Sequence, residues 1–249
     1  AAVARDARPP IVLVHGTGHG GWCWKYVAEY LRAAGHRVFA PTLTGCGERY
    51  HLRNPNVGLD THIDDVVAVF EAEELTNVVL VGHSYGGTVI TGVCDRLRDR
   101  IRHAVYLEGP APKDGQWNMS NTTREKYEAQ AGPLIDGYLM PVKLEAIPQL
   151  GISPDDKANI EWLRRRLTPH PVRTWFDPLR LKNGGSEGLP RTFVASTGGG
   201  PNSMVMQHAQ KLRSDPSWHV RELPGGHDFM VIVPRETAEL LIDVAIKAS

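Results

Sequence analysis

The chain has 249 residues, 41% of them hydrophobic, with 28 Lys and Arg residues against 28 Asp and Glu residues. A chain of this length and apolar content buries one sizeable core, so we expect a single domain over residues 1–249. Because positive and negative charges balance, the chain has no net electrostatic attraction for polyanions, which argues against nucleic acid or a membrane surface as a partner. A small, neutral molecule fits this composition better.

No apolar run approaches the roughly 20 residues of a membrane-spanning helix, and the N-terminus lacks the apolar core of a signal peptide. We therefore expect a cytoplasmic protein. The chain begins with Ala1 rather than Met, so a removed targeting or tag segment stays open. The three cysteines have no metal-type spacing and predict free thiols: Cys23, Cys46 and Cys94.

Short β-branched runs alternate with longer amphipathic stretches along the chain. The runs predict strands at residues 11–14, 37–40, 78–81, 103–107, 191–195 and 218–223. The stretches predict helices at residues 24–34, 61–74, 88–97, 203–212 and 235–248. This alternation predicts an α/β fold with a mostly parallel sheet flanked by helices, in which sites form at the carboxyl ends of the strands.

Residues 109–190 interrupt this alternation. They carry helical patterns at 123–131 and 154–167 but no convincing strand, so we interpret them as a helical cap inserted after the strand that ends at Glu108. Two long loops, 16–21 and 41–60, begin where strands end and are expected to form walls of the site.

The sequence Gly-His-Ser-Tyr-Gly at 82–86 matches G-x-S-x-G, whose small residues allow a tight turn that exposes a serine. The pattern recurs around Ser186, so context must decide between the two. Only Ser84 follows a strand pattern and precedes a helix pattern, whereas Ser186 lies in a segment rich in loop-forming residues. Ser84 is the predicted nucleophile.

A serine hydroxyl needs a base to remove its proton. Among the eleven histidines, His227 follows the last predicted strand in a Gly-Gly-His loop and so lies at the same sheet edge as Ser84. We predict that His227 is the base. His83 inside the turn and His15 at the end of the first strand are expected to be structural.

The base needs a carboxylate to orient it, and that acid usually follows a strand between the serine and the histidine. The strand at 191–195 is followed by a glycine-rich stretch without a carboxylate. Glu108, at the end of the strand before it, is therefore the predicted acid, with an arginine-paired hinge residue as the alternative. Asp228 is badly placed to orient the ring of His227, its direct neighbour.

Acyl transfer also needs donors for a developing oxyanion. We predict the backbone N–H groups of Thr17 and Tyr85, with an ordinary turn as the alternative for the first loop. Aromatic and small residues near the site predict a substrate pocket formed by Gly16, Trp22, Trp24, Trp117, Tyr138 and Trp162. No metal-ligand spacing, phosphate loop or dinucleotide fingerprint is present in the sequence, so we expect neither a metal nor a cofactor.

Four motifs occur in order along the chain: Val-Leu-Val-His-Gly at 12–16, Gly-Gly-Trp-Cys-Trp at 20–24, the turn at 82–87, and Gly-Gly-His at 225–227. With them the chain resembles the α/β-hydrolase superfamily. More narrowly, it is similar to the bacterial esterase branch related to plant methylesterases, hydroxynitrile lyases and pyrethroid-hydrolysing carboxylesterases.

Departures from the relatives refine this resemblance. Hydroxynitrile lyases of this branch carry threonine and lysine where this chain has Gly16 and Asp228, which favours the esterase side. Plant relatives place an aspartate after the penultimate strand, where this chain has glycines at 198–200. Bacterial relatives with an acidic residue at the position of Glu108 support that residue as the acid.

The residues and the resemblance together predict a carboxylesterase-type serine hydrolase that cleaves a small, neutral, fairly apolar ester, lactone or thioester through an acyl-serine intermediate. Two alternatives stay open: a cofactor-free lyase or dioxygenase that uses His227 as a base, and a small-ligand binding protein on the same fold. A homodimer also stays open.

Overall fold

The computed structural model describes residues 8–118 and 120–247. Six strands form one sheet in the order β2-β1-β3-β4-β7-β8, and every neighbouring pair is parallel. The strands are β1 (Ile11–Val14), β2 (Val38–Phe39), β3 (Val78–His83), β4 (Ile101–Leu107), β7 (Arg191–Ser196) and β8 (His219–Leu223). The predicted parallel sheet is confirmed, and it sets the carboxyl ends of β1, β3 and β4 side by side.

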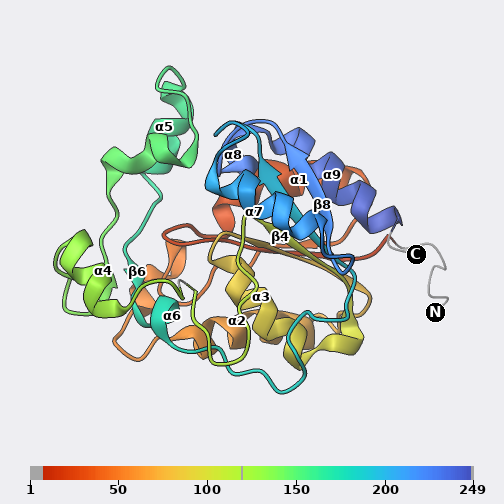
Figure 1. Ribbon diagram of the computed structural model, residues 1–249, viewed down its shortest axis with the longest axis horizontal. Helices are drawn as coiled ribbons and strands as arrows, with labels where there is room; N and C mark the ends of the chain where they lie inside the picture. The colour runs from red at the N-terminus through yellow and green to blue at the C-terminus, as the bar shows by residue number, and fades with distance from the viewer. Residues whose placement is uncertain (1–7, 119, 248–249) are drawn as a thin grey trace.

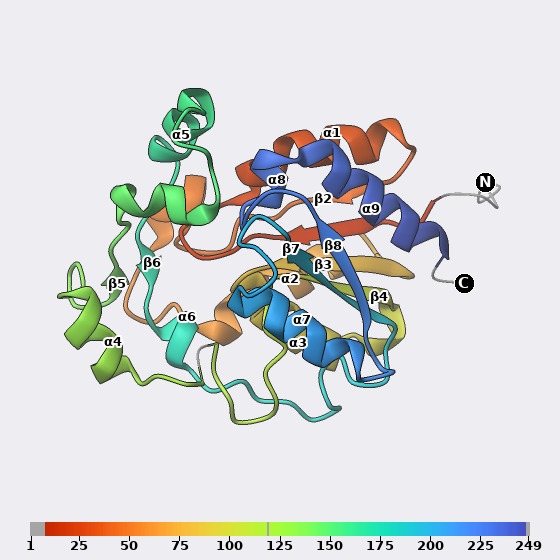
Figure 2. The ribbon, with the colours of Figure 1, turned by 45° about the horizontal axis from the view of Figure 1, so that its top comes forward.

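Helices cover both faces of the sheet (Figure 2). One face carries α1 (Lys25–Ala33), α8 (Phe229–Ile232) and α9 (Pro234–Lys247), and the other carries α2 (Leu59–Ala72), α3 (Gly86–Arg96) and α7 (Met204–Arg213). Side chains of a strand alternate between the two faces. In β1, accordingly, Ile11 and Leu13 join the first core and Val12 and Val14 join the second.

Strand β3 is buried along its whole length, as expected for a central parallel strand covered on both faces. None of the helices in the described ranges combines the length and the apolar content that crossing a bilayer requires.

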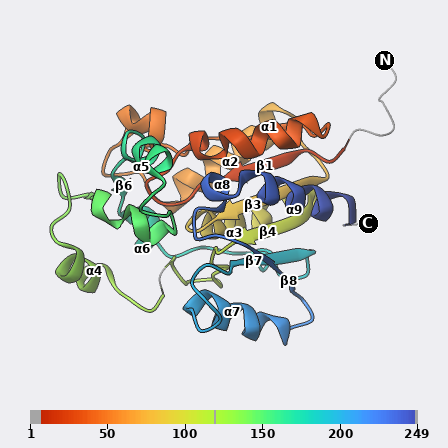
Figure 3. The same cartoon turned by 90° about the horizontal axis from the view of Figure 1, so that it is seen from above.

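The segment between β4 and β7, which was predicted to form a helical cap, is gathered at one end of the molecule (Figures 1 and 3). Two of its helices match the predicted ones, α4 (Arg124–Ala131) and α5 (Lys157–Arg164). Its other elements are β5 (Leu139–Met140), η4 (Leu144–Leu150), β6 (His170–Pro171) and α6 (Arg173–Phe176). The antiparallel pair of β5 and β6 was not expected, because two-residue strands leave no periodicity in the sequence. The division into one domain with residues 109–190 as its cap stays a prediction.

Several short elements were also missed, because one or two turns carry little pattern. They are η1 (Gly21–Trp24), η2 (Gly47–Leu52), η3 (Arg98–Arg100) and α8. The helix expected from residue 24 therefore begins as a 3₁₀ turn. Residue 248, the expected end of the last helix, lies outside the described residues.

The loop with the second G-x-S-x-G pattern is fixed to the end of α3. The carboxylate of Asp95 accepts backbone N–H groups from Lys182 (2.9 Å), Asn183 (2.6 Å) and Gly185 (3.0 Å). Burial raises the pKa of Asp95, but these hydrogen bonds outweigh it and hold the pKa below its ordinary value. Ser186 is buried behind this loop, and its hydroxyl accepts the O–H of Tyr106 at 2.7 Å.

We expect Asp95→Asn to lower the free energy of unfolding by about 2 kcal/mol near neutral pH, since hydrogen bonds to a charged group contribute roughly 1.5–3 kcal/mol. Because the folded pKa is lowered, this contribution is present above about pH 4 and disappears as the pH falls through the folded pKa. Urea unfolding of both proteins from about pH 7 to pH 3 measures the difference. A difference that stays constant over this range would contradict the assignment.

Candidate active site

Ser84 lies directly after β3, in the tight turn that leads into α3. Its φ of 52° is in the left-handed region, which costs a residue with a side chain roughly 1–2 kcal/mol. Two hydrogen bonds hold the turn: the N–H of Ser84 donates to the carbonyl of Leu107 at 3.0 Å, and its carbonyl accepts the N–H of Gly87 at 2.8 Å. The strained turn therefore depends on the neighbouring strand β4.

Close backbone contacts explain the glycines around Ser84. A Cβ atom on Gly82 would lie 2.5 Å from the carbonyl oxygen of Gly86, and one on Gly86 would lie 2.6 Å from that of Val14. A Cβ on Gly16 would lie 3.0 Å from the Cβ of Ser84. The loop after β1 thus contacts the serine directly, so no side chain fits between them.

His227 and Glu108 form a hydrogen-bonded pair beside this turn. The Nδ1 atom of His227 lies 2.6 Å from Oε2 of Glu108, and the other carboxylate oxygen accepts the N–H of Ser196 at 2.7 Å. Burial raises the pKa of Glu108, but the hydrogen bonds from His227 and Ser196 outweigh it and hold the pKa below its ordinary value. The ionised carboxylate only accepts, so Nδ1 of His227 carries the proton and Nε2 is left as the basic atom.

Partial exposure suits His227 to proton transfer. Its side chain is 29% exposed, whereas that of Glu108 is 7% exposed. Glu108 has a φ of 47°, so both Ser84 and Glu108 occupy the left-handed region directly after neighbouring strands. The Ser84 hydroxyl makes no hydrogen bond within residues 8–118 and 120–247, and catalytic hydrogen bonds often form only once substrate is bound.

His83 joins the serine turn to the His227 loop. Its Nε2–H donates to the backbone carbonyl of His227 at 2.8 Å, and the two rings lie 4.6 Å apart. Burial lowers the pKa of His83 to about 3, so the ring is neutral. This contact joins the loop of His227 to the residue directly before Ser84 and agrees with a structural part for His83. His15 is also buried, and its Nε2 accepts the N–H of Leu43 at 3.0 Å.

Two backbone donors at the site are free. Among the residues that the structure describes, the N–H groups of Thr17 and Tyr85 have no acceptor, whereas the N–H of Gly18 donates to His170 and that of Ser84 donates to Leu107. Thr17 is held through its other atoms, because its carbonyl faces Nδ1 of His19 at 2.8 Å and its hydroxyl accepts the indole N–H of Trp175 at 2.8 Å. The loop that follows β1 (residues 16–21, here the β1 loop) is therefore fixed in place while the N–H group of Thr17 stays unused.

A second histidine–carboxylate pair, formed by His19 and Asp228, lies behind this loop. Nε2 of His19 is 3.0 Å from Asp228, and Nδ1 faces the carbonyl of Thr17. Both partners only accept hydrogen bonds, so both nitrogens carry protons and His19 is an imidazolium. Burial lowers the pKa of His19, but Asp228 outweighs it and raises the pKa above its ordinary value.

This ion pair connects the two loops of the site. The side chains of His19 and Asp228 are 4% and 0% exposed, and the N–H of Asp228 donates to the carbonyl of Leu150 at 3.0 Å. Asp228 thus does not orient His227. Instead, its ion pair with His19 anchors the chain directly after His227 to the β1 loop. Sequence analysis missed the pair, because 209 residues separate its members and no local pattern marks them.

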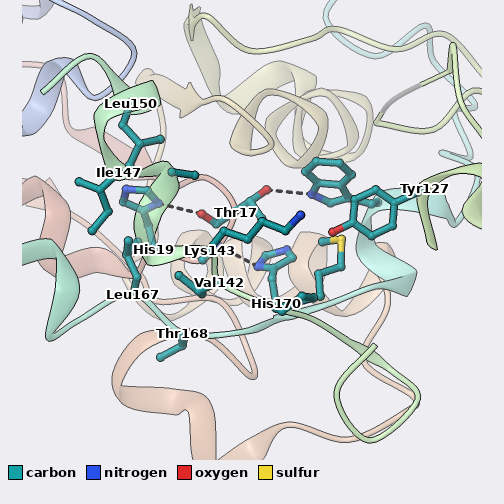
Figure 4. A pocket seen from close by; sticks show the side chains of 15 residues that line it. Thr17, His19, Tyr127, Val142, Lys143, Ile147, Leu150, Leu167, Thr168 and His170 are labelled. Carbon is teal, nitrogen blue, oxygen red and sulfur yellow. Dashed lines mark hydrogen bonds between the residues drawn. The ribbon is translucent and has the colours of Figure 1, made fainter. Parts of the chain in front are cut away.

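An apolar cavity of about 170 Å³ begins at Thr17 and His19 and extends under the predicted cap (Figure 4). Its apolar and aromatic walls include Tyr127, Met140, Val142, Ile147, Leu150 and Trp175. These residues come from a region whose sequence carries little periodicity, so they were not predicted. The aromatic residues among them, Tyr127 and Trp175, were the one sequence feature that could have indicated the walls of a cavity.

None of the six predicted pocket residues lines this cavity. Gly16 contacts Ser84, and Trp24 is fully buried in the core between the sheet and α1. Trp22 stacks on His19 at 5.4 Å and meets Trp162 edge-on at 5.1 Å, so these two tryptophans support the β1 loop from behind.

Trp117 and Tyr138, the remaining two, also lie outside this cavity. Trp117 lines a separate hollow beside α7, and Tyr138 directly precedes β5. Large aromatic residues are packed into cores more often than they line sites, so aromatic content alone says little about which residues line a pocket. The part of the six residues in substrate binding stays a prediction.

Within residues 8–118 and 120–247, no group of three His, Cys, Asp or Glu side chains is arranged to hold a metal ion. The three cysteines are buried and unpaired, as the sequence predicted.

We expect Asp228→Asn to lower the free energy of unfolding by about 3 kcal/mol, because removing one partner leaves a buried charge uncompensated. The folded pKa of His19 is raised, so the pair contributes fully below about pH 6.5 and its contribution is lost as the pH rises through the folded pKa. Urea unfolding near pH 6 and pH 9 should show a larger difference between wild type and variant at the lower pH. Equal differences would refute the imidazolium assignment.

Two proteins that are similar to this chain in sequence are both named as esterases. The chain is 41% identical over 235 residues to the carbendazim hydrolyzing esterase of Nocardioides sp. (strain SG-4G), and the match covers 92% of this chain and 97% of that protein. It is 29% identical over 266 residues to the probable esterase PIR7A of Oryza sativa subsp. indica, covering 97% and 98% of the two chains.

Among solved structures, an extracellular alpha/beta-hydrolase from a Paenibacillus species matches with a TM-score of 0.79 at 25% identity, covering 94% of this chain and 98% of that chain. The family model described as the alpha/beta hydrolase family matches residues 11–240. The predicted fold and resemblance are confirmed, and the chain belongs to the alpha/beta hydrolase family.

Proposed function

We propose that the protein is a carboxylesterase-type serine hydrolase in which Ser84, His227 and Glu108 form the catalytic triad. The observation that carries the proposal is the 2.6 Å contact between His227 and Glu108 beside a serine held at a φ of 52°. The esterase names of the similar proteins from Nocardioides and rice support the same chemistry.

In the proposed reaction, the hydroxyl of Ser84 attacks the ester carbonyl while Nε2 of His227 takes its proton. Glu108 holds the ring through Nδ1 and stabilises the imidazolium. The free N–H groups of Thr17 and Tyr85 donate to the oxyanion of the tetrahedral intermediate. His227 then protonates the leaving alcohol, and water, activated by the same nitrogen, releases the acid from the acyl-serine.

The substrate that we propose is a small, neutral and fairly apolar ester, lactone or thioester. Its support is the apolar cavity that begins at Thr17, one of the two proposed oxyanion donors. A substrate group in this cavity would be fixed close to the reacting carbonyl. A cytoplasmic location and a homodimer stay predictions from the sequence.

We expect Ser84→Ala and His227→Ala each to lower kcat by roughly 10⁴-fold or more, and Glu108→Gln to cause a smaller loss. The measurement is the hydrolysis of a panel of methyl, aryl and bulky-alcohol esters, lactones and thioesters. Ser186→Ala is the matched control, because its buried hydroxyl contacts Tyr106 instead of a histidine.

Full activity of Ser84→Ala would contradict the proposal, and so would a loss in Ser186→Ala equal to that in Ser84→Ala. Full activity of Glu108→Gln would remove Glu108 from the triad and leave the nucleophile and base in place.

A further inference from the structure

Trp175 connects the wall of the apolar cavity to the loop that carries a proposed oxyanion donor. It lies in α6, within the predicted cap, and lines the cavity together with Thr17. Its indole N–H donates to the hydroxyl of Thr17 at 2.8 Å, although 158 residues separate the two in sequence (Figure 4). An indole nitrogen only donates, so the threonine oxygen is the acceptor. Among the described residues, no other hydrogen bond reaches the side chain of Thr17.

The β1 loop is held in part by its own residues. The carbonyl of Gly16 accepts the N–H of His19 at 3.3 Å, and the carbonyl of Thr17 faces Nδ1 of His19 at 2.8 Å. Because both partners of each contact belong to the loop, these contacts maintain its shape. They do not hold the loop against the segment that covers it.

Residues 168–175 hold the loop from the side of the predicted cap. The N–H of Thr168 donates to the carbonyl of Gly18 at 3.0 Å, and the N–H of Gly18 donates to Nδ1 of His170 at 3.2 Å. Both of these contacts act on Gly18, whereas Trp175 acts on Thr17 itself. The side chain of threonine has few rotamers, so holding its oxygen also restrains the backbone of the same residue. The direction of the Thr17 N–H therefore depends on Trp175.

Trp175 is also connected to the helix that follows the proposed nucleophile. Its carbonyl accepts the N–H of Asn118 at 3.2 Å, and the amide oxygen of Asn118 accepts the hydroxyl of Thr88 at 2.7 Å. Thr88 lies in the first turn of α3, which begins directly after the turn that carries Ser84. A path of hydrogen bonds thus runs from α3 through Trp175 to the loop of the oxyanion donor. The nucleophile helix and the β1 loop are both held against the same tryptophan.

We propose that Trp175 is a positioning residue whose indole N–H holds Thr17 so that the backbone N–H of Thr17 reaches the oxyanion. The tryptophan acts through Thr17 and needs no contact with the reacting atoms. An oxyanion donor stabilises the tetrahedral intermediate more than it stabilises the bound ester, so displacing the donor lowers kcat instead of raising KM. This proposal rests on the proposed esterase function, in which Thr17 provides the donor.

Two substitutions remove this hydrogen bond from opposite ends. Trp175→Phe removes its donor and keeps an aromatic ring on the cavity wall, and Thr17→Val removes its acceptor and keeps the shape of the side chain. Loss of a whole oxyanion donor lowers kcat roughly 10²- to 10³-fold, so a displaced donor should cost about 10-fold. We expect each variant to hydrolyse phenyl acetate with a kcat about 10-fold lower than that of wild type and a KM within about threefold. The kcat values are expressed per active site titrated with an organophosphate, so that unfolded protein does not contribute.

Three further variants separate positioning from other effects. In the double variant Thr17→Val, Trp175→Phe, the two losses should not multiply, because both substitutions remove the same interaction. Thr17→Ser keeps the acceptor and should restore most of the kcat that Thr17→Val loses. Val142→Ala enlarges the same cavity without removing a hydrogen bond, so it should raise KM more than it lowers kcat.

A wild-type kcat in Trp175→Phe would overturn the proposal. A loss in Thr17→Val that Trp175→Phe does not share would also overturn it, because the threonine hydroxyl would then act without the indole, and so would losses that multiply in the double variant. Ser84→Ala separates this proposal from the esterase mechanism. If Ser84→Ala hydrolyses phenyl acetate as wild type does, the mechanism and the part of Trp175 fall together. If Ser84→Ala is inactive while Trp175→Phe has a wild-type kcat, only the part of Trp175 falls.

Discussion

Close backbone packing at the carboxyl edge of the sheet determines where Ser84 and Glu108, two members of the proposed triad, lie. The ends of β1, β3 and β4 meet there. A Cβ atom added to a glycine at this edge would lie as close as 2.5 Å to a backbone atom, so no side chain fits at these positions. This packing holds Ser84 at a φ of 52° and Glu108 at 47°, both of which an isolated chain avoids. The strain stored at these two residues is offset by the buried strands on either side.

Two consecutive residues, His227 and Asp228, belong to two histidine–carboxylate pairs with different chemistry. His227 is partly exposed, contacts the ionised Glu108 through one nitrogen and keeps the other nitrogen free, as a base requires. His19 is buried and uses both nitrogens, so its pair with Asp228 is an ion pair below the raised pKa of His19 and fixes the β1 loop. The environment of each ring, rather than its residue type, decides between proton transfer and structural support.

The sequence predicted the sheet, the nucleophile turn and the Glu108–His227 contact, because each depends on where a strand ends, and strands are visible as short apolar runs. It did not predict the cavity. The hydroxyl of Thr17 meets Trp175 across 158 residues, and the N–H of Gly18 meets His170 across 152. Such contacts depend on how the segment between β4 and β7 folds over the sheet, and that segment has weak periodicity.

The proposed mechanism requires that Ser84 forms a covalent acyl intermediate, which intact-protein mass spectrometry after trapping with an organophosphate can detect. We expect one adduct per chain, located on the peptide that contains Ser84, lost in Ser84→Ala and retained in Ser186→Ala. An enzyme that turns over esters but forms no adduct on Ser84 would refute this mechanism and favour one in which His227 acts alone as a base.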